Sequence, residues 1–149
     1  MKKIIAVCTT AFALVALPLL AHAQAKDTPI GLWKTFDDET KQAKSLIRIT
    51  EKDGVLSGKI EKLLDPTKQE SKCLKCTDDR KDKLVLGMTV LTGLKKADGE
   101  WNDGQILDPT KGEVYKAKAV LRDGGKQLDV RGFLGIALLG RTQTWVREE

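Results

Sequence analysis

Histidine is almost missing from this sequence, because His22 is the only one in 149 residues. Imidazole is the commonest general base near neutral pH and the commonest metal ligand in proteins. His22 lies in a segment that we expect to be removed, which would leave the chain without any imidazole. The sequence also contains no Gly-rich phosphate loop and no nucleophile elbow. We therefore predict a protein that is not an enzyme and that holds no metal and no cofactor.

Residues 1–23 are typical of a secretory signal peptide. Two lysines precede an apolar run over residues 4–20, and the small-residue box Ala21-His22-Ala23 follows it. The run is short for a membrane span and contains Pro18. Cys8 lies within the run and not at the cleavage point, which disfavours a lipid anchor. We predict cleavage before Gln24, export to the periplasm and no stable membrane anchor.

The predicted mature chain, residues 24–149, has the length of a single domain. Loss of Lys2 and Lys3 would lower the formal net charge from +5 to +3. The remaining basic residues are scattered among Asp and Glu, whereas nucleic-acid-binding proteins usually gather basic charge on one face. We expect a mixed surface and no nucleic-acid partner.

Short apolar runs separated by turn residues predict eight β-strands and no long helix. Asp-Gly pairs lie at three of the breaks, and such pairs favour tight hairpins because glycine adopts positive φ without steric cost. The predicted strands are Ile30–Phe36, Lys44–Glu51, Gly54–Leu63, Leu84–Leu94, Glu100–Leu107, Glu113–Leu121, Gln127–Leu134 and Leu139–Arg147.

Alternation of apolar and polar residues within these strands favours a sheet with one wet face. Successive hairpins with an even strand count place the first and last strands antiparallel, so that they can pair and remove both edges. We predict an all-β, single antiparallel up-and-down barrel of about eight strands, with a β-sandwich as the alternative. Residues 64–83 form a long charged loop, which is unusual in a compact domain unless it is functional or held by a cross-link.

The long loop carries Cys73-Leu74-Lys75-Cys76, a CxxC spacing that allows a tight disulfide. Haem attachment would need a histidine next, where Thr77 stands, and zinc normally takes four ligands. We predict a disulfide between Cys73 and Cys76. A redox role and intermolecular metal binding are the alternatives at this point.

A second pattern links the first and last predicted strands. Gly31-Leu32-Trp33 opens the first strand and Arg147 closes the last, which resembles the lipocalin arrangement. That resemblance implies a barrel plug, in which the Arg147 guanidinium covers the Trp33 indole and shields it from water. The alternative is that Trp33 is simply a core aromatic.

The stretch from Val130 to Trp145 is more specific. Together with Trp101, Gly104-Gln105-Ile106-Leu107-Asp108-Pro109 and the CxxC pair, it resembles a family of exported bacterial proteins called domain of unknown function 2147. The resemblance implies a lipocalin-like barrel in the periplasm and brings no catalytic residues.

Arg141, Gln143 and Trp145 share one face of the last strand. If that face points into the barrel, the arginine needs a partner or a ligand, because a buried unpaired charge is very unfavourable. If the face points outward, Arg141 is solvated or paired with an aspartate. Arg131 and Tyr115 are further candidates for ligand contact.

These residues predict a non-catalytic carrier of a small apolar or amphipathic ligand, including an acidic one. The alternatives are a thiol–disulfide redox role for Cys73 and Cys76, and a structural or interaction module of the cell envelope.

Overall fold

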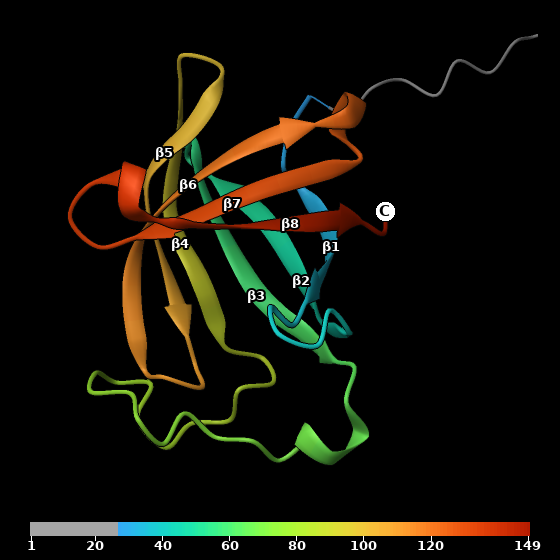
Figure 1. Cartoon of the computed structure of the whole chain (residues 1–149), viewed down its shortest axis with the longest axis vertical. Coiled ribbons are helices and arrows are strands. Elements are labelled where there is room, and N and C mark those ends of the chain that lie inside the picture. The colour runs from blue at the N-terminus through green and yellow to red at the C-terminus, as the bar shows by residue number, and fades with distance from the viewer. Residues whose placement is uncertain (1–26) are drawn as a thin grey trace, which may run out of the picture.

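The computed structural model describes residues 27–149, so the predicted signal peptide over residues 1–23 lies outside the described part of the chain. Eight antiparallel strands follow one another in an up-and-down order (Figure 1). The strands are β1 Gly31–Phe36, β2 Ala43–Lys52, β3 Val55–Leu63, β4 Thr89–Ala97, β5 Glu100–Asp108, β6 Glu113–Arg122, β7 Gln127–Phe133 and β8 Arg141–Arg147.

Strand β1 pairs with both β2 and β8, so the sheet closes into a barrel with strand order β1 to β8. The closing contact is short, with Trp33 opposite Arg147 and Lys34 opposite Val146. The prediction of a single closed up-and-down barrel is confirmed, and the sandwich alternative is wrong. Closure pairs the first strand with the last, which covers part of the edge that each would otherwise expose.

The two ends of the barrel have different connections, and we name them by that difference. At the turn end, Asp53-Gly54 and Asp98-Gly99 each join two strands with both residues at positive φ. The third turn, Asp123-Gly124-Gly125, forms the short 3₁₀ helix η2 at the same end. At the loop end, longer connections span residues 37–42, 64–88, 109–112 and 134–140.

The core lies inside the barrel and is made of inward-facing side chains from every strand. Trp33 and Trp145 are the two largest fully buried side chains, and Trp101 is also buried. Aliphatic side chains fill the space around the indoles, among them Ile49, Leu56, Leu91, Leu94 and Leu128. Buried residues also reach the loop end, among them Leu63, Met88 and Leu107.

The expected strand over Leu84–Leu94 begins later than the sequence predicted. Strand β4 starts at Thr89, and the residues before it belong to the long connection, which therefore spans 64–88. Leu84 forms an isolated bridge with Lys72 across that connection. The apolar residues Leu84, Val85 and Leu86 mimic a strand in sequence, but only Val85 packs against the core.

The short helical turns add little regular structure. Pro66–Lys68 forms the 3₁₀ helix η1 in the long connection, and Ala137–Leu139 forms η3 between β7 and β8. Within residues 27–149, no helix has the length and apolar character needed to cross a bilayer.

Candidate functional site at the loop end of the barrel

Three side chains on the inner face of β8 lead from the core to the loop end. Trp145 is buried, Gln143 is half-buried, and the side chain of Arg141 is 60% exposed. Side chains alternate along a strand, so Gln143 and Arg141 share the inward-pointing side of Trp145. The Trp145 indole Nε1 donates a hydrogen bond of 3.3 Å to Gln143 Oε1, which orients the amide nitrogen toward the loop end.

A carboxylate from another part of the chain meets these donors. Asp38, in the connection between β1 and β2, accepts a 2.7 Å hydrogen bond from Gln143 Nε2 and lies 3.0 Å from Arg141 Nη2. Both contacts are made by the same oxygen, Oδ2. Two donors from one strand therefore converge on a single carboxylate oxygen at the mouth of the barrel.

The β1–β2 connection is shaped by its neighbouring aspartate. Asp37 Oδ1 accepts a 2.8 Å hydrogen bond from the backbone N–H of Thr40 and one of 3.1 Å from its hydroxyl. These bonds lower the pKa of Asp37, because they favour its ionised form. The turn is thus held by Asp37, which leaves the Asp38 side chain free to point toward β8.

Tyr115 contributes a phenol from β6 near the same end. Its hydroxyl donates a hydrogen bond to Glu113, and this bond, reinforced by desolvation, raises the pKa of Tyr115 to about 12. The positive charge of Arg141 acts in the opposite direction and lowers the Tyr115 pKa. The phenol therefore lies within electrostatic reach of Arg141.

Arg131 lies apart from this group, although the sequence placed it among the ligand-contact candidates. Its neighbour Val130 is buried in the core, so Arg131 points to the outer face of β7. Its guanidinium donates to the carbonyl oxygens of Ala137 at 2.6 Å and Leu138 at 3.1 Å, and to Thr142 Oγ1 at 2.8 Å. Arg131 holds the β7–β8 connection and does not face the barrel mouth.

The turn end carries the arginine–tryptophan pair. Arg147 Cζ lies 4.2 Å from the centroid of the Trp33 ring, and its nitrogens donate to the carbonyl oxygens of Gly125, Ile30 and Thr28. Trp33 Nε1 donates to Pro29 O at 2.7 Å. Every polar group of the pair is satisfied by protein, so this end of the barrel is sealed.

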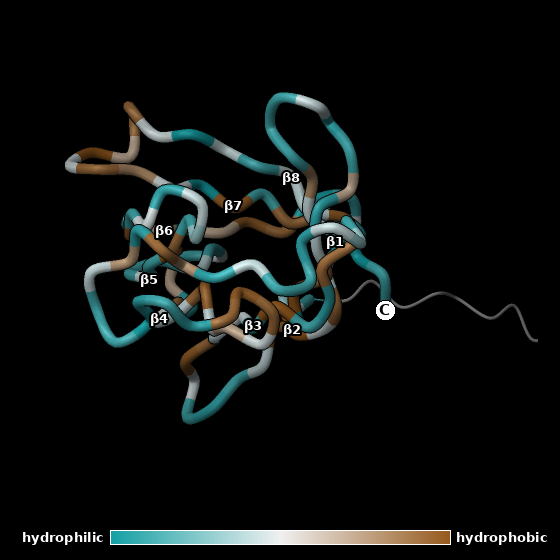
Figure 2. The backbone as a smooth tube through the Cα atoms, turned by 90° about the horizontal axis from the view of Figure 1, so that it is seen from below, coloured by the Kyte–Doolittle hydropathy of each residue, from teal (hydrophilic) through white to brown (hydrophobic). Residues whose placement is uncertain are grey.

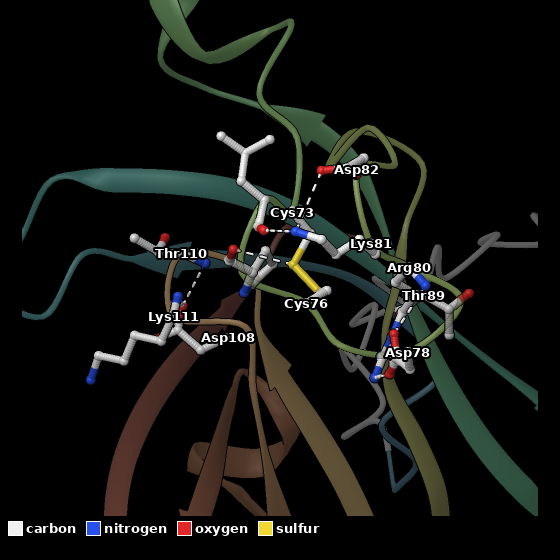
Figure 3. Close-up of a disulfide and its surroundings, with 12 residues drawn as sticks. Cys73, Cys76, Asp78, Arg80, Lys81, Asp82, Thr89, Asp108, Thr110 and Lys111 are labelled. Atoms are coloured by element: carbon white, nitrogen blue, oxygen red, sulfur yellow. Dashed lines mark hydrogen bonds and ion pairs between the residues drawn. A yellow bond between two sulfur atoms is a disulfide. The ribbon is translucent and has the colours of Figure 1, made fainter.

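A disulfide joins Cys73 and Cys76 in the long connection, as the CxxC spacing predicted (Figure 3). Both cysteines are buried, and Cys73 Sγ lies 3.4 Å from Pro109 O in the neighbouring β5–β6 connection. Gly112 approaches so closely that a Cβ placed there would lie 2.2 Å from the Lys75 carbonyl group. Thiol–disulfide exchange needs access to a sulfur, so this packing supports a structural bridge over a redox site.

Two hollows among the described residues lie on the outer surface. One, of about 280 Å³, lies over β4, β5 and β6 beside the Asp78–Arg80 ion pair. The other, of about 400 Å³, lies over β2 and β3 beside Arg48 and Glu61. In each hollow an arginine is already bound to a carboxylate of the protein, and neither hollow opens into the barrel.

Asp38 was missed by the sequence analysis. It stands in Asp37-Asp38-Glu39-Thr40, which looks like an ordinary acidic turn. The sequence did indicate that an inward-facing arginine must have a partner. It could not identify Asp38, because 103 positions separate it from Arg141 and only barrel closure brings them together.

A closed eight-stranded barrel with one sealed end and one polar mouth is the architecture of a lipocalin-like protein. The family model described as "Uncharacterized protein conserved in bacteria (DUF2147)" matches residues 31–147, and the chain belongs to that family. Among solved structures, protein HP1028 of the human pathogen Helicobacter pylori, described as belonging to the lipocalin family, is similar in fold. Its TM-score is 0.70 at 18% sequence identity, with 80% of this chain and 82% of that chain covered. No curated protein matches the sequence.

Proposed function

We propose that the barrel binds a small amphipathic carboxylate at its loop end, without catalysis. The observation that carries this proposal is the convergence of Arg141 and Gln143 on one carboxylate oxygen, that of Asp38. A guanidinium and an amide N–H are matched donors for a carboxylate. Asp38 therefore marks the position that the acidic group of a ligand would take.

The exchange of Asp38 for a ligand requires only a local movement. Asp38 belongs to a six-residue connection in which residues 39–42 are exposed. An ion pair at a solvent-exposed position contributes at most about 1 kcal/mol, so its loss is easily offset by a new carboxylate on the same donors. The half-buried Ile106 and Tyr115 provide apolar surface for the rest of the ligand.

The filled core sets the expected size of the ligand. The indole of Trp145 lies directly below Gln143, so a bound molecule would stop there and extend outward to the loop end. This arrangement favours a short-chain or partly exposed amphipath over a long chain enclosed within the barrel. It also fits small-ligand binding, which is common among barrels of this class.

The test is a titration with a fluorescent fatty acid, cis-parinaric acid, followed by competition with decanoate and with decanol. We expect saturable binding that decanoate displaces and decanol displaces poorly, because decanol lacks the carboxylate. Arg141→Gln should weaken binding by up to about fivefold, since an exposed guanidinium contributes at most about 1 kcal/mol to an ion pair. Asp38→Asn should strengthen binding, because it removes the competing charge.

Arg147→Gln is the matched control, since it removes an arginine from the same strand at the sealed end. A titration in which no saturable binding occurs would overturn the proposal. Equal displacement by decanol and decanoate, with no response to Arg141→Gln, would also overturn it.

The location that we propose for this activity is the periplasm. Its support is the residue pattern of the first 23 residues. Fractionation of cells that express the full chain should place the protein in the periplasm, with a sequenced N-terminus at Gln24. A product in the cytoplasm that retains Met1 would contradict this part of the proposal.

A further inference from the structure

The connection between β7 and β8 exposes four large apolar side chains to solvent. Leu134, Ile136, Leu138 and Leu139 have relative exposures of 63%, 59%, 82% and 79%. We call these four residues the apolar tip. Figure 2 shows the connection as a hydrophobic protrusion that extends away from the barrel wall. Clustered exposed apolar residues of this kind mark a contact surface for another phase or molecule.

The apolar tip is built to present its side chains while its backbone is partly satisfied. Arg131 binds the carbonyl oxygens of Ala137 and Leu138, and Gly140 N–H donates to Ala137 O at 3.1 Å. Leu139 N–H donates to Ile136 O at 3.3 Å. Backbone groups that enter an apolar phase must find partners within the protein, because no water is available there. These bonds meet part of that requirement.

Positively charged residues flank the apolar tip in sequence and on the neighbouring strand. Arg131 and Arg141 bracket the uncharged stretch 132–140, and no acidic residue occurs between Val130 and Arg147. On the neighbouring strand β6, Lys116 pairs in register with Phe133, and Lys118 pairs with Arg131. Two acidic residues reach this group: Glu100 lies 3.4 Å from Lys118, and Asp38 lies 3.0 Å from Arg141.

From this combination we propose that the apolar tip inserts into the surface of an anionic lipid bilayer. A convex protrusion with apolar side chains can enter a fluid layer that has no fixed shape. The arginines and lysines at its base would then lie at the level of the lipid phosphates, where they are attracted to negative charge. Four side chains give reversible association, which is distinct from a spanning segment or a covalent lipid anchor.

This inference rests on residues of the β7–β8 connection and goes beyond the proposed ligand binding. Substitutions in the apolar tip leave Asp38, Arg141 and Gln143 unchanged, so the two proposals can fail separately. A bilayer-docked barrel would hold its loop end close to a source of amphipathic molecules, but vesicle binding is expected whether or not a ligand is bound.

The first experiment compares vesicle co-sedimentation of the full chain with that of Leu138→Asp/Leu139→Asp. Vesicles of phosphatidylcholine mixed with phosphatidylglycerol serve as the anionic surface, and pure phosphatidylcholine serves as the neutral one. The double variant should bind the anionic vesicles about tenfold or more weakly, because two apolar contacts are replaced by charges that the bilayer repels. Leu74→Asp is the matched control, since Leu74 is 63% exposed and lies in the long connection.

The wild type and all variants are prepared with the same N-terminal residues, so a difference in vesicle binding between them cannot arise from the N-terminus. Lys116→Glu/Lys118→Glu tests the electrostatic part, and it should reduce binding to the anionic vesicles without affecting the weak binding to neutral ones. Equal binding of the wild type, the tip variant and the Leu74→Asp control would overturn the proposal.

The second experiment locates the apolar tip directly. Leu138→Trp introduces an exposed indole, whereas the native Trp33, Trp101 and Trp145 are buried. On anionic vesicles that contain brominated lipid, the new indole should be quenched and its emission should shift to the blue. An equal shift in emission without vesicles would point to a second copy of the chain as the partner. If sedimentation of the protein alone then shows a dimer that Leu139→Asp abolishes, the apolar tip pairs with that copy and the bilayer proposal is wrong.

Discussion

The two ends of this barrel carry the same residue type on the same strand and use it differently. Arg147 at the turn end donates to three backbone carbonyl groups and covers the Trp33 ring. Arg141 at the loop end is 60% exposed and pairs with Asp38, which comes from a solvent-exposed connection. Burial lowers the pKa of Arg147, yet guanidinium remains charged at any physiological pH. The partners therefore decide whether an arginine is structural or available for a ligand.

The connections repeat this contrast. Tight Asp-Gly turns seal one end, and their backbone requires the positive φ that Asp53, Gly54, Asp98 and Gly99 adopt. At the other end the chain uses long segments, one held by a buried disulfide and one exposing the apolar tip. Stability should therefore depend mainly on the turn end, and recognition on the loop end.

The largest expected effect is at the sealed end. Trp33→Ala removes a fully buried indole, its 2.7 Å hydrogen bond to Pro29 O and the surface that Arg147 covers. Removal of a large buried aromatic side chain typically costs about 3–5 kcal/mol of unfolding free energy. Urea unfolding followed by circular dichroism measures the loss. Trp33→Phe keeps a ring beneath Arg147 and should be distinctly less destabilising, so an equal loss in both variants would contradict the role of the ring.

The two arginines provide the most direct way to break the comparison. Arg147→Gln should lower the unfolding free energy by about 2–3 kcal/mol, because it removes the cation–π contact and charged hydrogen bonds to three carbonyl groups. Arg141→Gln should change it by less than about 1 kcal/mol, since an exposed ion pair contributes little. Urea unfolding measures both variants. If Arg141→Gln proved as destabilising as Arg147→Gln, the two ends would not differ as we propose.

The disulfide is expected to have a smaller effect, because Cys73 and Cys76 close a very short segment. The loop-closure argument gives about 2 kcal/mol or less for such a bridge. Unfolding in urea with and without a reductant should show this difference, while Cys73→Ala/Cys76→Ala should show no dependence on the reductant. Because both cysteines are buried, the folded protein should also resist reduction in the absence of urea. Rapid reduction of the folded protein would favour the redox alternative.

The sequence was informative where the physics is local. Asp-Gly turns, alternating strands and the CxxC spacing each depend on residues within a few positions, so the barrel and the Cys73–Cys76 bridge could be predicted. The residues Leu84–Leu86 misled the strand assignment, because an apolar run in a cross-linked loop resembles a strand in sequence. The Asp38–Arg141 contact could not be predicted, since it depends on the register with which β1 closes against β8.

The orientation of side chains on the last two strands shows the same limit. Period-two alternation places Arg141, Gln143 and Trp145 on one face, but it does not say which face is inside. The burial of Trp145 and Val130 settles this in the structure, and it sends Arg131 to the outer face. The exposure of the apolar tip was also missed, because Ile136, Leu138 and Leu139 look like core residues when only composition is considered.

The smallest expected effect is on the pKa of Tyr115. It tests whether the candidate site residues lie close together. Tyr115 is the only tyrosine in the chain, so the near-ultraviolet absorbance of tyrosinate reports on it alone. Its pKa of about 12 arises mainly from the hydrogen bond to Glu113, so Glu113→Gln should move the pKa back toward 10. Since the raised pKa favours the neutral phenol in the folded state, the stabilisation is complete below pH 10 and is lost as the pH rises toward 12.

Arg141→Gln should move the same titration in the opposite direction. The guanidinium lowers the Tyr115 pKa, so its removal should raise the pKa slightly above that of the wild type. Arg147→Gln, which changes charge at the sealed end, should leave the titration unchanged at a pH where the variant is still folded. An identical response to both arginine variants would mean that Tyr115 does not sense the loop-end arginine. The phenol would then have to be removed from the proposed carboxylate site, which would consist of Arg141 and Gln143 alone.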